Sequence, residues 1–161
     1  MKSIYWVVSL KSEAFTIIKE LRLFKFKNKN KFLIYKNDCG SHWLIISGIG
    51  KKNCLKAIDY LIDEGKPNRW TVWINIGIAG HISNDIGKLA LVNKITDETS
   101  NNSFYPSLIL PLNCKKLSLL TVQSPTNNYS SNTLVDMEGF NFYKKISKKF
   151  TKELIVLIKI I

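Results

Sequence analysis

Three short segments combine glycine with polar or acidic side chains where the chain is expected to turn. They are residues 47–51 (Ser-Gly-Ile-Gly-Lys), 75–80 (Asn-Ile-Gly-Ile-Ala-Gly) and 134–139 (Leu-Val-Asp-Met-Glu-Gly). Glycine after a buried strand lets the backbone approach a bound group closely, and a carboxylate accepts strong hydrogen bonds from a ligand. Taken singly, each segment also has a structural explanation: a strand-to-helix turn, a tight bend, and an acidic helix start stabilised by the helix dipole.

Glu13 is a further acidic candidate, close to the end of the first apolar run. Residues 4–10 are apolar without helical spacing, which predicts a strand covered on both faces. Ser12 offers an N-cap to a helix whose apolar stripe includes Phe15 and Leu21, so Glu13 is expected in the first helical turn beside the carboxyl end of that strand. α/β proteins keep their ligands at such places. The alternative is an ordinary N-terminal helix acid.

Apolar runs and turn signals predict the elements that position these groups. Strands are expected at 32–35 and 42–47, joined as a hairpin, and at 70–76, 89–95, 117–122 and 154–161. One helix is expected to end near Gly65, and another to carry Leu134, Met137 and Phe140 on one face. Because strands alternate with helices and no repeat or linker divides the chain, we expect one α/β layered domain over residues 1–161.

The strongly basic composition raises the question of an anionic partner. Lysine and arginine outnumber aspartate and glutamate by 24 to 12, which gives a formal charge of +12. The lysines are scattered at element ends and on presumptive helix faces, with no nucleic-acid-binding motif among them. We interpret the charge as a solvated basic surface and expect no nucleic-acid partner, with a basic nucleic-acid-binding protein as the less favoured alternative.

The cysteines and the apolar runs bear on location. Cys39, Cys54 and Cys114 form no CxxC pair and have no histidine at metal-ligand spacing, so we expect reduced thiols of a cytoplasmic protein and no metal site. No apolar run approaches the roughly 18 residues that span a bilayer. Lys11 and Glu13 also interrupt the first apolar stretch before a signal-peptide core can form. We therefore expect a protein that is neither secreted nor inserted in a membrane.

Taken in order, the three segments resemble the superfamily of purine nucleoside phosphorylases and of the nucleosidases that cleave methylthioadenosine and S-adenosylhomocysteine. That superfamily has a Gly-Ile-Gly-Lys turn, a strand ending in an Asn-x-Gly-x-Ala-Gly-like segment, and a Met-Glu helix start. The resemblance extends over residues 4–161. It implies a three-layer αβα fold of the phosphorylase/hydrolase type with a central mixed sheet. It also implies no metal or organic cofactor, a small-molecule nucleoside as ligand, and a homodimer or higher homo-oligomer.

The resemblance implies roles for individual residues. Glu138 would accept hydrogen bonds from the ribose hydroxyls, Met137 would pack under the sugar, and Glu13 would position or deprotonate an attacking water. Cleavage of a ribosidic bond develops positive charge on the sugar, so carboxylates near the sugar stabilise the transition state. The other substrate-binding residues that the resemblance implies are Ser9, Ile49, Gly77, Ile78, Ala79, Gly80 and Asp136.

Two departures from the superfamily pattern affect the expected chemistry. The phosphorylases have an arginine where Asn75 stands and a phosphate-binding serine where Ile78 stands, so hydrolysis is favoured over phosphorolysis. In the superfamily, a Ser-Asp pair and a final helix follow the strand that resembles residues 154–161, and the aspartate protonates the departing purine. Neither follows that strand in the printed chain. General acid catalysis is typically worth about 10² to 10⁴ in rate. The chain is therefore expected to be truncated, to use another acid, or to catalyse inefficiently.

These observations leave two main hypotheses. The first is a purine nucleosidase or phosphorylase-type enzyme that cleaves the N-glycosidic bond. The second is a catalytically impaired member of the superfamily, which binds a nucleoside or serves as an oligomer subunit. Release of free base from a nucleoside distinguishes the first hypothesis from the second.

Overall fold

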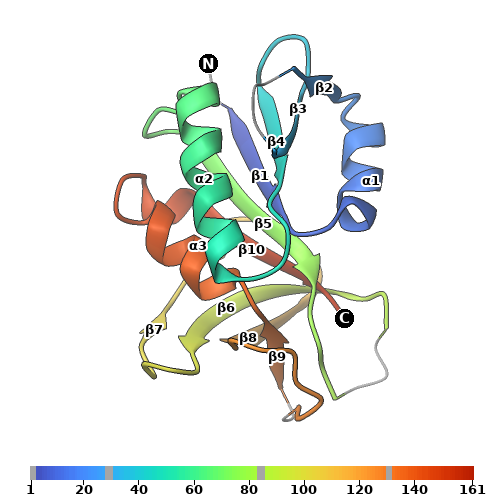
Figure 1. Cartoon of the computed structure of the whole chain (residues 1–161). Helices are drawn as coiled ribbons and strands as arrows, with labels where there is room; N and C mark the ends of the chain where they lie inside the picture. The colour runs from blue at the N-terminus through green and yellow to red at the C-terminus, as the bar shows by residue number, and fades with distance from the viewer. Residues whose placement is uncertain (1–2, 28–30, 83–85, 130–131) are drawn as a thin grey trace.

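A single mixed β-sheet carries helices on both of its faces (Figure 1). The computed structural model describes residues 3–27, 31–82, 86–129 and 132–161. In chain order its elements are β1 (Ile4–Val8), α1 (Lys11–Glu20), β2 (Phe24–Phe26), β3 (Leu33–Lys36), β4 (His42–Ile46), α2 (Lys51–Gly65), β5 (Val72–Ile78), β6 (Leu89–Asp97), β7 (Ser103–Phe104), β8 (Lys115–Thr121), β9 (Thr133–Asp136), α3 (Gly139–Ile146), the 3₁₀ turn η1 (Lys152–Leu154) and β10 (Ile155–Ile160). The strands lie in the order β2-β3-β4-β1-β5-β10-β6-β8-β9, and β7 pairs with β6.

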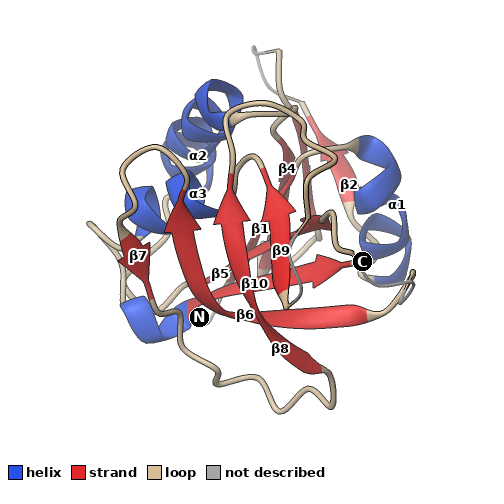
Figure 2. Ribbon diagram, turned by 90° about the horizontal axis from the view of Figure 1, so that it is seen from below, coloured by secondary structure: helices blue, strands red, loops and turns tan. Residues whose placement is uncertain are grey.

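The central strands run parallel and end at one edge of the sheet. β1 pairs in parallel with β4 and β5, and β5 pairs in parallel with β10. β10 then pairs antiparallel with β6, and Figure 2 shows β6, β8 and β9 side by side with one common direction. Because the central strands are covered on both faces, they are almost uninterrupted apolar runs. Their carboxyl ends gather at one place, which is where open α/β sheets bind ligands.

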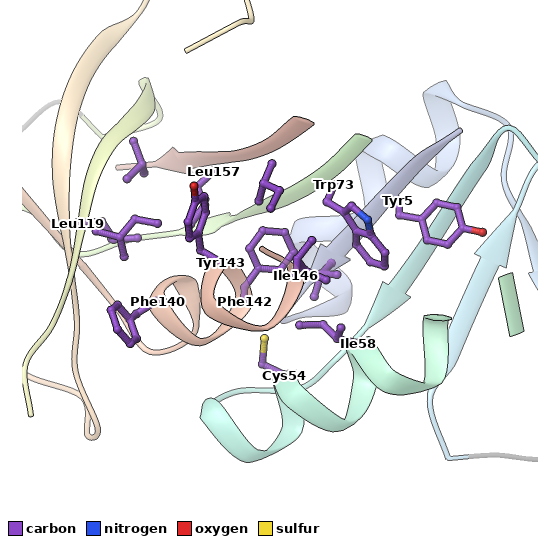
Figure 3. Close-up of a cluster of buried hydrophobic side chains, with 14 of the residues drawn as sticks. Tyr5, Cys54, Ile58, Trp73, Leu119, Phe140, Phe142, Tyr143, Ile146 and Leu157 are labelled. Atoms are coloured by element: carbon purple, nitrogen blue, oxygen red, sulfur yellow. The ribbon is translucent and has the colours of Figure 1, made fainter. Parts of the chain in front are cut away.

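Hydrophobic cores on both faces hold the three layers together. On one face, α2 and α3 cover the sheet, and Cys54 of α2 and Phe142 of α3 are buried in the same cluster as Trp73 of β5 (Figure 3). On the other face, α1 buries Ala14 in a smaller cluster with Val8 of β1. The layers are therefore helix, sheet and helix, and the expected three-layer αβα fold with a central mixed sheet is confirmed.

Several predicted elements are confirmed, and two helix starts are corrected. β3 and β4 pair antiparallel, as the predicted hairpin requires. Residues 134–136, expected in a helix, instead form β9, because Leu134 pairs with Leu119 of β8 and this sheet pairing overrides the helical spacing of Leu134 and Phe140. The N-cap of α1 is Leu10, and Ser12, expected at that position, lies exposed inside the helix. Neither β2 nor β7 was expected, because each is too short to show the alternation of apolar and polar residues that marks a strand.

An isolated β-bridge brings the far end of the sheet back over its centre. Gly80, just after β5, pairs antiparallel with Val135 of β9. Each residue donates its N–H to the carbonyl oxygen of the other at 2.9 Å. Three strands lie between β5 and β9 in the sheet order, so the bridge requires the sheet to curl. The bridge therefore places residues 135–138 beside the end of β5.

Candidate active site

A cavity of about 290 Å³ opens at the carboxyl ends of the central strands. It brings together residues from all three segments that the sequence singled out, together with the start of α1. The expected site residues that line it are Ser9, Glu13, Ile49, Gly77, Ile78, Asp136, Met137 and Glu138. Small-molecule pockets typically measure about 300–1,000 Å³, so the cavity is at the small end of that range.

Ala79 and Gly80, also expected in the site, lie behind this lining. Ala79 is buried and donates its N–H to the carbonyl of Ile160 at 2.9 Å. Gly80 forms the bridge to Val135, and a side chain on Gly80 would collide with the ring of Tyr129. Tyr129 itself lines the cavity. The glycine therefore lets an aromatic ring lie against the backbone at the cavity wall.

Backbone hydrogen bonds tie the turn after β4 to the end of β1. Ser47 donates its N–H to the carbonyl of Val8 at 2.8 Å, and Gly48 donates to the carbonyl of Ser9 at 3.0 Å. Gly48 and Gly50 both have positive φ angles, of 80° and 91°. Glycine adopts such angles without steric cost, so this turn can enter α2 directly from the strand.

The carboxylate of Glu13 is fixed between the start of α1 and the end of β5. One oxygen accepts the N–H of Leu10 at 2.8 Å, and the other accepts the N–H of Ile78 at 2.8 Å. A Cβ atom on Gly77 would lie 3.2 Å from this carboxylate, so glycine at that position leaves room for it. Two carboxylate oxygens offer about four acceptor sites, so Glu13 can still accept a hydrogen bond from a water in the cavity.

The carboxylate of Glu138 lies where the N-termini of two helices meet. Glu138 is the N-cap residue of α3 and is only 7% exposed. One of its oxygens accepts the N–H of Gly50, the N-cap residue of α2, at 2.5 Å. Burial raises the pKa of Glu138, and the negative charges of Asp136 and Glu13 add to that rise. The Gly50 N–H and the positive charge of Lys159 oppose it.

Lys159 is a site residue that was not expected from the sequence. It lines the cavity from β10 and is 2% exposed. Its ammonium lies 2.8 Å from Oδ2 of Asp136 and donates a hydrogen bond of 2.7 Å to Oδ1 of Asn75. Asn75 donates in turn to the carbonyl of Val7 at 3.1 Å. One signal in the sequence could have found it: a lone lysine inside an apolar strand. Buried charges are nearly always paired, so such a lysine predicts an acidic partner.

Asp136 connects this lysine to the start of α3. Its Oδ2 accepts the N–H of Gly139 at 2.9 Å, and its Oδ1 accepts the hydroxyl hydrogen of Thr121 at 2.7 Å. The Thr121 oxygen accepts the N–H of Phe140 at 2.9 Å. The first two N–H groups of α3 are therefore satisfied by two buried side chains, as helix N-termini require. Both Asp136 oxygens thus have protein partners, although Asp136 lines the cavity.

The described part of the chain shows no group of three or more His, Cys, Asp or Glu side chains placed to hold a metal ion. Cys39, Cys54 and Cys114 are free thiols. Burial raises the pKa of the Cys54 thiol, and the negative charges of Glu138 and Asp136 raise that pKa further. Among the described helices, none is long and apolar enough to cross a membrane.

No family model and no curated protein matches the chain, whereas many solved structures do. The Helicobacter pylori 5′-methylthioadenosine/S-adenosylhomocysteine nucleosidase, solved with butyl-thio-DADMe-Immucillin-A, superimposes with a TM-score of 0.80 at 12% identity, over 99% of this chain and 84% of that one. The Chlamydia trachomatis MTAN bound to MTA gives 0.75 at 21% identity, over 99% and 81%. A futalosine hydrolase mutant of Helicobacter pylori gives 0.77 at 13% identity, over 100% and 89%. The chain has the nucleosidase fold.

The nucleosidase fold accounts for the arrangement of the three sequence segments. The expected resemblance is thereby confirmed in the architecture, although at 12–21% identity the likeness is one of fold. The segments are far apart in the chain and meet only through the sheet order and the bridge between Gly80 and Val135. Within this nucleosidase fold, the cavity is lined by the carboxylates of Glu13, at the start of α1, and of Glu138, at the start of α3, together with that of Asp136.

Proposed function

We propose that this chain hydrolyses the N-glycosidic bond of a purine nucleoside. The observation that carries the proposal is the position of Glu13 and Glu138 in one cavity, at the carboxyl ends of the central strands of a nucleosidase fold. Similar structures hold MTA or adenine, which supports a purine as the base. The substrate is a small molecule, and the residues at the site supply the chemistry without a cofactor.

The two carboxylates suit the charges that develop during such a cleavage. The N-glycosidic bond breaks as the base departs with the electron pair, and the sugar acquires oxocarbenium character. Ionised Glu138 accepts hydrogen bonds from the ribose hydroxyls, which stabilises the positively charged sugar. Glu13 accepts a proton from the water whose oxygen bonds to the anomeric carbon. The departing base takes up a proton from solvent, which completes the hydrolysis.

The remaining lining suits the apolar parts of a nucleoside. Met137 packs under the sugar, and Ile49 and Ile78 offer apolar surface beside it. The ring of Tyr129 lies at the wall and provides a flat surface on which a base can stack. Ser9 and Gly77 line the cavity at the ends of β1 and β5 and leave room for the substrate.

The charges around the cavity favour water over phosphate as the attacking group. Among the described lining residues, Lys159 is the only basic one, and its ammonium is already paired with Asp136. Asn75, where the phosphorylases have arginine, is buried and bonded to Val7 and Lys159. Ile78 stands where they have a phosphate-binding serine, and its side chain offers no hydroxyl. A phosphate dianion would thus lack a cation of its own.

A base-release assay tests the proposal. Purified protein is incubated with methylthioadenosine, S-adenosylhomocysteine, adenosine or inosine, with and without phosphate, and free base is measured by chromatography. We expect base release from at least one purine nucleoside without phosphate. We also expect Glu138→Gln and Glu13→Gln to lower kcat/KM by at least about 100-fold, because each removes a charge that acts in the transition state. Failure of all four compounds to release base would refute the proposal.

We also infer a cytoplasmic location and a homo-oligomeric state. The three free thiols support a reducing compartment. Large apolar side chains stand exposed on two segments beyond the site, and such surfaces mark association sites in soluble proteins. We refer to these exposed side chains together as the apolar surface: Ile82, Ile86, Leu89, Tyr105, Leu108, Ile109 and Leu112. Leu89 and Leu112 line one open hollow, so the two segments meet there.

A further inference from the structure

Two acidic side chains lie two positions apart at the cavity, and both are almost fully buried. Asp136 is 6% exposed and Glu138 is 7% exposed. Like charges in a shared buried site oppose each other's ionisation, so one of two such carboxyls tends to be protonated. Glu138 accepts ribose hydroxyls most strongly, and through both oxygens, when it is ionised. The site therefore needs a positive charge close to the pair.

We propose that Lys159 is a positioning residue, which acts through Asp136 to keep Glu138 ionised and in place for the ribose. This inference rests on the proposed function for the role of Glu138. The ion pair between Lys159 and Asp136 measures 2.8 Å, and Asn75 of the neighbouring strand β5 accepts a hydrogen bond from the same ammonium at 2.7 Å. Lys159 thus has a fixed place in the lining instead of an exposed, mobile head group.

The hydrogen bonds of Asp136 connect this charge to the backbone that carries Glu138. Asp136 accepts the N–H of Gly139, the residue directly after Glu138. Thr121 bonds both to Asp136 and to the N–H of Phe140. On the other side of Glu138, the carbonyl of Asp136 accepts the N–H of Val122 at 2.8 Å, so the backbone is held before and after Glu138. Lys159 belongs to β10, so the pair anchors the start of α3 to the central sheet.

The groups that act on Glu138 come from every element around it. Asp136 of β9 and Glu13 of α1 disfavour its charge, whereas Lys159 of β10 and the Gly50 N–H at the start of α2 favour it. Cys54 of α2 is also close enough to interact with Glu138, but burial raises its pKa and keeps it a neutral thiol. Among these described neighbours, Lys159 is the one that supplies a positive charge. Without that charge, the repulsion that Asp136 and Glu13 exert on ionised Glu138 would be opposed only by the hydrogen bond from the Gly50 N–H.

Carboxyl titration by NMR in the ligand-free protein tests the inference without using catalysis. Side-chain ¹³C-labelled glutamate is followed against pH, and Glu138→Gln assigns the signal. We expect Lys159→Met to raise the pKa of Glu138 by about one unit and Asp136→Asn to lower it by a similar amount, since each removes one nearby charge. Opposite shifts are specific to an electrostatic role, because general damage to the fold would not reverse its sign between the two variants.

A second pair of variants covers loss of folding. Breaking one side of a buried ion pair is strongly destabilising, so Lys159→Met alone can fail to fold. In Asp136→Asn the ammonium keeps the oxygen of Asn75 as a hydrogen-bond partner. Comparison of Asp136→Asn with the double variant Asp136→Asn, Lys159→Met then isolates the charge of Lys159. We expect the pKa of Glu138 to be higher in the double variant by about one unit. Two controls should leave the titration of Glu138 unchanged. Lys159→Arg keeps the charge, and Lys148→Met removes an exposed lysine just after the end of α3.

The outcomes separate this inference from the proposed function. Equal pKa values of Glu138 in Asp136→Asn and in the double variant would overturn it, whatever the enzyme assay shows. If the shifts occur but no purine nucleoside is cleaved, the electrostatic role stands and the proposed reaction falls. If both hold, the acid limb of the kcat/KM profile should move to higher pH in Lys159→Met and stay in place in Lys159→Arg.

Discussion

At the scale of single residues, Glu138 combines burial with a charge that its proposed role requires. Its carboxyl is buried beside Asp136, and its pKa is raised from the ordinary value of 4.5. Compared with the unfolded state, the folded state therefore binds the proton of Glu138 more tightly. The stability that the group contributes is complete below about pH 4.5 and is lost as the pH rises through the folded-state pKa. Holding this acid ionised at neutral pH thus costs stability, as functional groups often do.

Replacing Glu138 by glutamine should remove that pH-dependent cost. The amide oxygen can still accept the Gly50 N–H, while no charge remains to be desolvated. We expect Glu138→Gln to melt higher than the wild type at pH 7, by about 2–4 °C for each kcal/mol gained, and to melt alike near pH 4. Thermal unfolding followed by circular dichroism at several pH values measures this difference. A constant difference across the pH range would contradict the assigned origin.

At the scale of elements, the start of α3 depends on side chains from two strands. Thr121 of β8 and Asp136 of β9 satisfy the first N–H groups of the helix, although no residue at its N-cap offers a capping side chain. The Asp136 cap comes from the strand directly before the helix, whereas the Thr121 cap comes from β8, 19 positions from Phe140, so the helix start depends partly on the sheet.

Thr121→Val tests this dependence with little change of shape. The valine cannot accept the Phe140 N–H or donate to Asp136, and it leaves a buried N–H unsatisfied. We expect a loss of about 1–3 kcal/mol in the free energy of unfolding, measured by urea denaturation. Thr16→Val, at an exposed position of α1, is the matched control and should change stability by only a few tenths of a kcal/mol. Equal effects of the two substitutions would show that the Thr121 hydroxyl does not cap α3.

The same elements show how far sequence reasoning reached. The central strands were predicted because strands buried on both faces leave continuous apolar runs, as residues 155–160 do. Residues 134–136 were assigned to a helix, because Leu134 and Phe140 fit a helical stripe and the partner strand β8 is not visible locally. Glu13 was singled out because it follows the first strand, and Glu138 because the Met-Glu helix start resembles that of the superfamily. Lys159 was missed because its partners lie 23 and 84 positions away, so only the folded chain reveals the pair.

At the scale of the whole molecule, the exposed apolar surface is the feature that calls for a partner. Ile86 is 84% exposed and Tyr105 is 71% exposed, and both belong to that surface. A net charge of +12 would keep separate copies soluble and apart, unless burial of apolar area outweighs the repulsion. A second copy of the chain is the partner that the resemblance implies.

Light scattering after size-exclusion chromatography tests the oligomeric state. We expect the wild-type protein to elute as a dimer or a larger assembly at micromolar concentration. Ile109→Asp places a charge on the apolar surface and should shift the protein toward monomer, whereas Phe15→Asp, at an exposed position of α1, should not. A monomeric wild type would contradict the inference.

The bridge between Gly80 and Val135 has a consequence for folding kinetics. It joins residues 55 positions apart in the chain, and the cavity forms only when it closes. Closing such a long loop costs entropy before any contact repays it, so high contact order slows this step. The capacity to bind a ligand should therefore be acquired late in refolding, after the local hairpin of β3 and β4 is already in place.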